Sequence, residues 1–126
     1  MENQVNNLKI LIAEDNQALR IILCGFVRCY SREILYAATG VEAIEICKNN
    51  PDIDLILIDF HMPVMNGCEA ARQIRTFNKE VIIILETADS FSDETTEFSR
   101  EGINDYFYKP YNRISLNNLV ARYFNM

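Results

Sequence analysis

Acidic and hydroxyl side chains follow several short apolar stretches in this chain of 126 residues. Glu14 and Asp15 come directly after the first stretch, and Asp59 follows the third. Thr87 and Lys109 come shortly after the fourth and the fifth. Carboxylates, a hydroxyl and an ammonium group in one place can together hold a divalent cation and an anionic group such as a phosphoryl. Whether these residues act together depends on the elements that carry them.

The apolar stretches themselves predict strands. Several of them are apolar at consecutive positions, which is typical of strands that are buried on both faces in a parallel sheet. The expected strands are Lys9–Ala13, Ile34–Ala38, Leu55–Ile58, Val81–Leu85 and Ile103–Phe107.

Apolar residues at helical spacing separate these strands and follow the last one. The clearest patterns are Leu19, Ile22, Leu23, Phe26 and Val27, and then Leu116, Leu119, Val120, Tyr123 and Phe124. Shorter ones are Val41, Ile44 and Cys47, ended by Asn49-Asn50-Pro51, and Ala70, Ile74 and Phe77. Ser90–Arg100 has the weakest pattern and is expected to be a mobile helix. Strand and helix alternate five times, which predicts a doubly wound α/β fold with helices on both faces.

In such a sheet, ligands bind beyond the carboxyl ends of the strands, where the five polar residues would meet. Three neighbouring carboxylates repel one another, and a single lysine does not compensate them. Mg²⁺ suits a site of a few carboxylates completed by water and phosphate oxygens. Asp59 would then be able to attack phosphorus and form an acyl phosphate. Each residue alone has a simpler explanation, since Asp15 or Asn16 can cap a helix, Thr87 can end a strand and Lys109 can be solvated.

Composition narrows the choice of function. The net charge of −6 argues against direct nucleic-acid binding, because phosphate backbones repel an acidic surface. The longest aliphatic run, Val81–Leu85, is too short to insert in a membrane, and Met1–Asn7 lacks the features of a secretory signal. The expected location is therefore cytoplasmic. The four cysteines lack metal-ligand spacing, and the three within helical patterns are expected to be buried thiols.

The polar residues also lie in segments that resemble the response regulator receiver domain. These segments are Ile12-Ala13-Glu14-Asp15-Asn16, Leu57–Gly67 (Leu-Ile-Asp-Phe-His-Met-Pro-Val-Met-Asn-Gly), Thr87-Ala88 and Asp105–Pro110 (Asp-Tyr-Phe-Tyr-Lys-Pro). The second is the most specific, and Thr87 and Lys109 follow Asp59 by 28 and 50 positions, as receivers lead one to expect. The match runs from about Lys9 to the end, and it implies a five-stranded sheet in the order 2-1-3-4-5. The length fits one domain, so we expect a single receiver domain over residues 1–126, with 1–7 as a flexible segment.

The resemblance also implies a role for each site residue. Asp59 would be the phosphoacceptor, and Glu14, Asp15, Asp59 and the backbone carbonyl of His61 would hold Mg²⁺, with Mn²⁺ as an alternative ion. Thr87, Ala88 and Lys109 would bind the phosphoryl group. Thr87 and Tyr106 would switch a surface formed by the fourth helix, the fifth strand and the fifth helix. The donor would be a histidine kinase or a histidine phosphotransfer protein, the output would be a downstream protein target, and the domain would catalyse only its own phosphorylation and dephosphorylation.

Three further residues call for comment. The His61 side chain is expected at the rim of the site, where it and Asp89 would flank the path of attacking water and set the lifetime of the phosphate. Glu86 departs from the family, which usually has an apolar or small residue before the threonine. Strand alternation points Glu86 away from the face that Thr87 uses, toward a helix layer. There it must find a partner or reach solvent.

Two other functions compete with this interpretation. A magnesium-dependent phosphatase of the haloacid-dehalogenase type also uses an aspartate nucleophile, but it normally carries an Asp-x-Asp motif, whereas Phe60-His61 follows Asp59. A receiver-like interaction module without phosphorylation would usually have lost an acid, the lysine or the threonine. The sequence leaves open whether the chain is a freestanding regulator or part of a hybrid histidine kinase. Its Glu-Asp-Asn and Asp-x-x-Met-Pro-x-Met-x-Gly motifs slightly favour the hybrid kinase.

Overall fold

The computed structural model describes residues 7–87, 102–108 and 112–124. Its elements are β1 (Leu8–Ala13), α1 (Gln17–Val27), a short 3₁₀ helix η1 (Arg28–Tyr30), β2 (Ser31–Ala37), α2 (Gly40–Asn49), β3 (Leu55–Asp59), α3 (Gly67–Arg75), β4 (Ile82–Thr87), β5 (Asp105–Tyr108) and α5 (Arg113–Phe124). The helix expected over Ser90–Arg100 lies outside the described residues, as do residues 1–6 of the expected amino-terminal segment.

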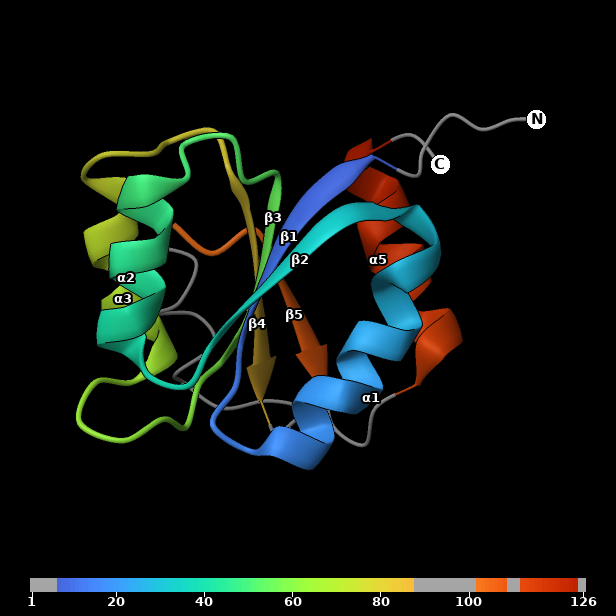
Figure 1. Cartoon of the computed structure of the whole chain (residues 1–126), viewed down its shortest axis with the longest axis horizontal. Coiled ribbons are helices and arrows are strands. Elements are labelled where there is room, and N and C mark those ends of the chain that lie inside the picture. The colour runs from blue at the N-terminus through green and yellow to red at the C-terminus, as the bar shows by residue number, and fades with distance from the viewer. Residues whose placement is uncertain (1–6, 88–101, 109–111, 125–126) are drawn as a thin grey trace.

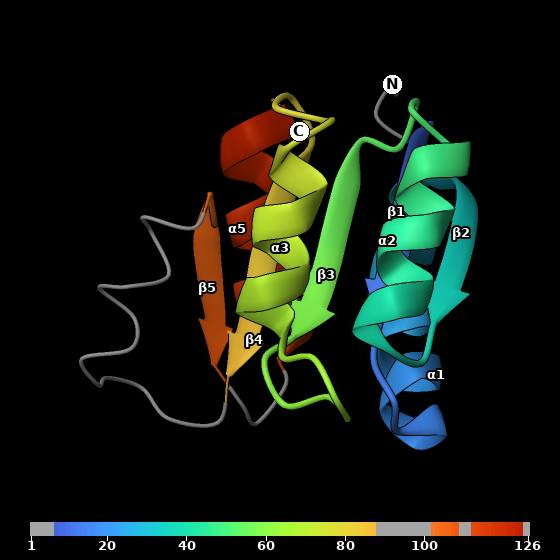
Figure 2. The ribbon, with the colours of Figure 1, turned by 90° about the vertical axis from the view of Figure 1, so that its left-hand side faces the viewer.

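The five strands form one parallel sheet in the order β2-β1-β3-β4-β5. Helices α1 and α5 cover one face of the sheet, and α2 and α3 cover the other (Figure 1; Figure 2 shows the second pair in front). The predicted fold class and strand order are therefore confirmed. Because all five strands run in the same direction, their carboxyl ends lie at one edge of the sheet.

Strand alternation divides the hydrophobic core into two layers. Odd residues of β1 and β4 and even residues of β3, such as Leu11, Ile56 and Leu85, pack toward α2 and α3. Their neighbours, such as Ile12, Leu57 and Ile84, pack toward α1 and α5. Every residue of β1 and β3 is buried, which explains why all of their residues except Lys9 and Asp59 are apolar.

Polar side chains define where the helices begin. The Asn16 side chain accepts a hydrogen bond from the backbone N–H of Leu19 (3.0 Å) at the start of α1, and Thr39 does the same at α2. At α3, Asn66 and Glu69 each accept a hydrogen bond from the backbone N–H of the other, which is a capping box. Of the two caps considered for the first helix, Asn16 is the one observed, and Asp15 is left for another role.

Some strand bounds and some helix faces depart from the sequence-based expectations. Strand β2 is Ser31–Ala37 instead of Ile34–Ala38, and β5 is Asp105–Tyr108 instead of Ile103–Phe107. Strand β4 continues through Glu86 and Thr87, which were expected to follow it, because its ladders with β3 and β5 extend to these residues. Ile22, Val41 and Phe77 were expected on buried helix faces but are exposed. In α1 the buried positions are Leu23, Cys24 and Val27, and Phe77 lies beyond the end of α3 at Arg75.

The cysteines are as expected. Cys24, Cys47 and Cys68 are buried in helices and Cys29 is exposed, all as free thiols. Burial raises the pKa of the Cys47 thiol to about 12, so this side chain is neutral at physiological pH and packs as a small hydrophobe. No helix within residues 7–87, 102–108 and 112–124 has the length and apolar character needed to cross a membrane.

The loop between β3 and α3 contains an unusual backbone conformation. The backbone N–H of Met65 donates a hydrogen bond to the carbonyl of Pro63 (2.7 Å), which closes a three-residue γ-turn. The central residue, Val64, has a φ of +71° and a side chain that is 99% exposed. A β-branched residue is strained at positive φ, and here no burial compensates the strain.

We therefore expect Val64→Asn to stabilise the protein. Asparagine tolerates positive φ far better than valine, and the substitution should raise the free energy of unfolding by about 1 kcal/mol. Denaturant unfolding measures this value. Val64→Ile, which keeps the β-branch, is the matched control and should leave stability unchanged. Equal stability of the asparagine variant and the wild type would contradict the expected strain.

Candidate metal and phosphoryl site

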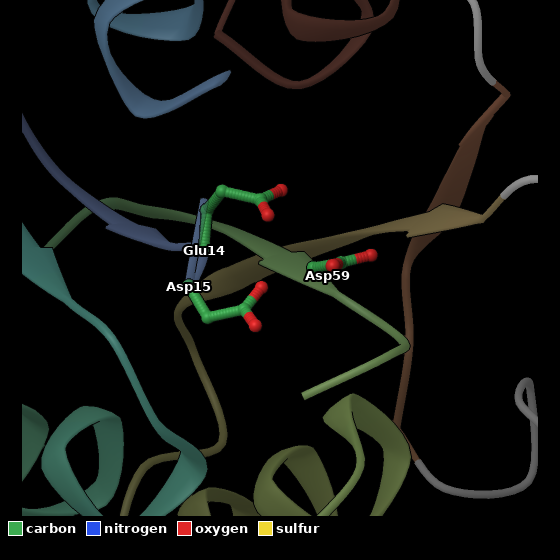
Figure 3. A group of neighbouring side chains, drawn as sticks. All are labelled: Glu14, Asp15 and Asp59. Atoms are coloured by element: carbon green, nitrogen blue, oxygen red, sulfur yellow. The ribbon is translucent and has the colours of Figure 1, made fainter. Parts of the chain in front are cut away.

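The acidic residues of the site come from two neighbouring strands. Ala13 of β1 pairs in register with Ile58 of β3, so the residues that follow them, Glu14 and Asp59, lie side by side. Asp15 is next in the chain. One ligand atom from each of these three carboxylates lies within 4.8 Å of the others. In Figure 3, the side chains of Glu14 and Asp15 leave the end of β1 and point toward Asp59, which lies at the end of β3. The predicted convergence of the three acids is therefore present.

The three carboxylates differ in exposure. Glu14 is 1% exposed and Asp59 is 2% exposed, whereas Asp15 is exposed. Two buried carboxylates beside a third are costly to ionise together unless a cation compensates them. Oxygen donors at this spacing match the preference of hard divalent cations, and an open side leaves room for water or a substrate oxygen. The residues present thus fit a divalent metal site.

Backbone contacts fix Glu14 in place. Its N–H donates a hydrogen bond to the carbonyl of Ala37 in β2 (2.9 Å), and its own carbonyl accepts one from Nη1 of Arg20 (2.7 Å). The Oε2 atom of Glu14 accepts a hydrogen bond from the backbone N–H of Asn16 (3.2 Å). These contacts tie the first acid to the sheet edge and to the start of α1.

Asp59 is held by the loop that follows it. The N–H of Phe60 donates to the carbonyl of Glu86 in β4 (2.9 Å), and the N–H of Gly67 donates to the carbonyl of Phe60 (2.9 Å). A Cβ atom on Gly67 would lie 2.4 Å from the backbone oxygen of Asp59. The start of α3 therefore packs directly against the backbone of the candidate acceptor, at a distance that only glycine allows.

Of the remaining predicted site residues, the structure describes Thr87, Tyr106 and His61, and three others lie outside the described residues. Thr87 is buried at the end of β4, and Tyr106 lies in β5 on the same side of the sheet, packed against the cluster beneath α2 and α3. The His61 side chain is exposed, as expected for the rim, and its ring meets Phe60 edge-on with centroids 4.8 Å apart. Ala88, Asp89 and Lys109 lie outside the described residues. The roles assigned to all of these residues stay predictions.

Glu86 is an unusual residue type for its place in the sequence, and the structure places it beside the candidate acceptor, which the sequence does not predict. It is 0% exposed, so the alternative in which it reaches solvent is excluded. It pairs in register with Asp59 on one side and Phe107 on the other. Strand alternation predicts the direction of the Glu86 side chain. Its neighbour across the ladder can be identified only when the register between β3 and β4 is known.

Comparison with known proteins supports this geometry. The family model of the response regulator receiver domain matches residues 10–121. The chain belongs to this family. Over 96% of its length the chain is 30% identical to the peroxide stress-activated histidine kinase mak3 of Schizosaccharomyces pombe. The matched part is 6% of the length of that kinase.

Two solved receiver structures are similar throughout the chain. The receiver domain of Ssk1 from Saccharomyces cerevisiae, crystallised with the histidine phosphotransfer protein Ypd1, has a TM-score of 0.88 and 32% identity, covering 98% of this chain and 93% of that one. The receiver domain of the sensor histidine kinase PA1611 from Pseudomonas aeruginosa, with magnesium coordinated in its active-site cleft, has a TM-score of 0.84 and 30% identity. It covers 94% of this chain and 98% of that one.

Proposed function

We propose that this receiver domain accepts a phosphoryl group on Asp59 with the help of a bound Mg²⁺ ion. The observation that carries the proposal is the group of three carboxylates within 4.8 Å of one another, with Asp59 at the carboxyl end of a central strand. In this fold class, that edge of the sheet is the place where ligands bind.

The acceptor step needs no general base to remove a proton from the nucleophile, because a carboxylate such as that of Asp59 attacks in its ionised form. A carboxylate oxygen attacks phosphorus and forms an O–P bond, while the N–P bond of a phosphohistidine breaks and its electron pair stays on the ring nitrogen. The leaving imidazole is neutral when its other nitrogen carries a proton. Thr87 and Lys109, with the backbone of Ala88, are the groups we assign to the transferred phosphoryl oxygens.

The residues that would hold the metal are Glu14, Asp15, Asp59 and the backbone carbonyl of His61. A bound Mg²⁺ offsets negative charge on the carboxylates and on the phosphoryl oxygens. Mn²⁺ has a similar preference for oxygen ligands and is expected to substitute for it. The magnesium in the PA1611 receiver, which is 30% identical to this chain, supports this choice of ion.

The donor we propose is a phosphohistidine on a histidine kinase or a histidine phosphotransfer protein, by analogy with the Ssk1 receiver and its partner Ypd1. The new phosphoryl charge would draw Thr87 inward and let Tyr106 move behind it, which changes the surface offered to a downstream protein. The domain would promote its own phosphorylation and dephosphorylation and would turn over no other substrate.

The direct test offers the protein a phosphorylated histidine phosphotransfer protein with Mg²⁺ and follows the phosphate on both partners. The expected result is a loss of phosphate from the donor and a matching gain on this chain within minutes. Chelation of Mg²⁺ or the Asp59→Asn substitution should stop the gain. If several such donors transfer nothing to the wild type, the chain is better described as a receiver-like interaction module.

A further inference from the structure

Exposed apolar side chains surround the edge of the sheet at β2. Strand β2 is an outermost strand, and α1 and α2 lie on opposite sides of it (Figures 1 and 2). Ile21 of α1 is 64% exposed, Tyr36 of β2 is 45% exposed and Val41 of α2 is 56% exposed. Tyr36 lines two surface hollows of about 300 and 390 Å³, which it shares with Ile21 and with Val41. An open strand edge beside apolar side chains is a surface on which another chain can bind.

The α1 side of this edge is basic. Helix α1 contains no acidic residue, and Arg20 lines the first hollow beside Ile21. Arg28 follows α1 directly and is exposed, and its Nη2 atom reaches back to the sulfur of Cys24 (3.7 Å). Among the residues that the structure describes, Arg28 has no acidic partner. Its charge can therefore pair with an acid on a second chain.

The α2 side of the edge is acidic. Glu42 and Glu45 line the second hollow, and both are exposed. Glu42 accepts a hydrogen bond from the backbone N–H of Ala38 (2.7 Å), whereas Glu45 has no basic partner within the described part of the chain. The basic residue of α2, Lys48, lies over the ring of Phe77, 5.8 Å from its centroid, and so points away from β2. The two sides of the edge thus carry opposite charges.

These opposite charges favour one arrangement of two copies. A two-fold axis parallel to the strands makes α1 of each copy face α2 of the other, so that Arg28 meets Glu45 twice. An axis perpendicular to the sheet would set α1 against α1 and α2 against α2, and like charges would meet. Arg28 and Glu45 also lie at similar depths, because α1 and α2 begin just after the paired residues Ala13 and Ala37 and Arg28 reaches back by one turn.

We propose that the β2 edge is a docking surface for a second copy of this chain, with Ile21, Tyr36 and Val41 at its centre and an Arg28–Glu45 ion pair on each side. The net charge of −6 repels two copies at long range, and the local pairing of opposite charges offsets this repulsion at contact. The dimer is therefore weak and forms in the micromolar range. It does not require phosphorylation, and it leaves the opposite edge of the sheet, at β5, uncovered.

Charge reversal tests this pairing. Sedimentation velocity over a range of protein concentrations should show a monomer–dimer equilibrium for the wild type. Glu45→Lys and Arg28→Glu should each raise the dissociation constant of the dimer by roughly tenfold, because like charges then meet twice. An equimolar mixture of the two variants should dimerise as the wild type does, since each pair in the mixed dimer again joins a base to an acid.

The matched control is Glu80→Lys, which reverses an exposed acid before β4 and should leave the dimer unchanged. Val41→Asp places a charge at the centre of the surface and should prevent dimerisation. Circular dichroism of each variant checks that it is folded. A wild type that stays monomeric at several hundred micromolar would leave this surface to a different partner and overturn the proposal. A mixture of Glu45→Lys and Arg28→Glu that stays monomeric while the wild type dimerises would overturn it as well.

Discussion

Asp15→Asn should weaken Mg²⁺ binding by roughly tenfold to a hundredfold, because it removes one of three negative ligands and leaves a poorer neutral donor. Asp15 is the exposed member of the acidic group, so its loss leaves no cavity in the core. Isothermal calorimetry of Mg²⁺ binding measures the effect. Glu45→Gln, an exposed acid on α2, is the charge-matched control and should bind Mg²⁺ as the wild type does.

The same substitution should have the opposite effect on stability in the absence of metal. Without Mg²⁺ the three carboxylates repel one another, so Asp15→Asn should unfold at a higher denaturant concentration than the wild type. Added Mg²⁺ should then stabilise the wild type and have little effect on the variant, since stabilisation by a ligand depends on its concentration relative to its dissociation constant. Equal stabilisation of both proteins by Mg²⁺ would mean that Asp15 is not a ligand.

Gly67→Ala should destabilise the protein by about 2–3 kcal/mol, the upper part of the range for overpacked sites. The new Cβ would lie 2.4 Å from the backbone oxygen of Asp59 and 3.0 Å from Cδ1 of Leu85. The leucine side chain can move, but the backbone oxygen belongs to the central strand β3. Either α3 or the end of β3 must shift, so phosphorylation of Asp59 should also become slower. Denaturant unfolding and the rate of phosphorylation by acetyl phosphate measure the two effects.

Gly25→Ala is the matched control for this prediction. Gly25 lies inside α1, and a Cβ atom there would meet nothing within 4 Å. Because alanine favours helix more than glycine does, this variant should be more stable by about 0.5–1 kcal/mol. A Gly67→Ala protein as stable as the wild type would show that the loop after β3 accommodates a side chain, contrary to the packing described above.

Much of the fold could be predicted because its patterns are local and strong. The continuous apolar runs in β1 and β3 predicted buried strands, and both strands are buried throughout. The acids after these runs were expected to meet because parallel strands end at one edge of the sheet, and Glu14, Asp15 and Asp59 do meet. The strand order came from the resemblance to receivers and not from the periodicity.

Other features depend on tertiary contacts that periodicity does not contain. The polar residues Glu86 and Thr87 were expected after β4, yet pairing with β3 and β5 keeps them in the strand. Ile22 fits the apolar spacing of α1 as well as Leu23 does, and only packing against the sheet decides which of them is buried. The positive φ of Val64 was equally hidden, because valine is a residue type that seldom adopts it.

The proposed function requires Asp59 to be the residue that takes the phosphoryl group. Its most direct test is incubation with acetyl phosphate, reduction with borohydride, which converts an aspartyl phosphate to homoserine, and peptide mass spectrometry. The expected result is homoserine at position 59 in the presence of Mg²⁺ and none after chelation. Reduction at another acid, or phosphate found on His61 instead, would contradict the assignment of Asp59 as the acceptor.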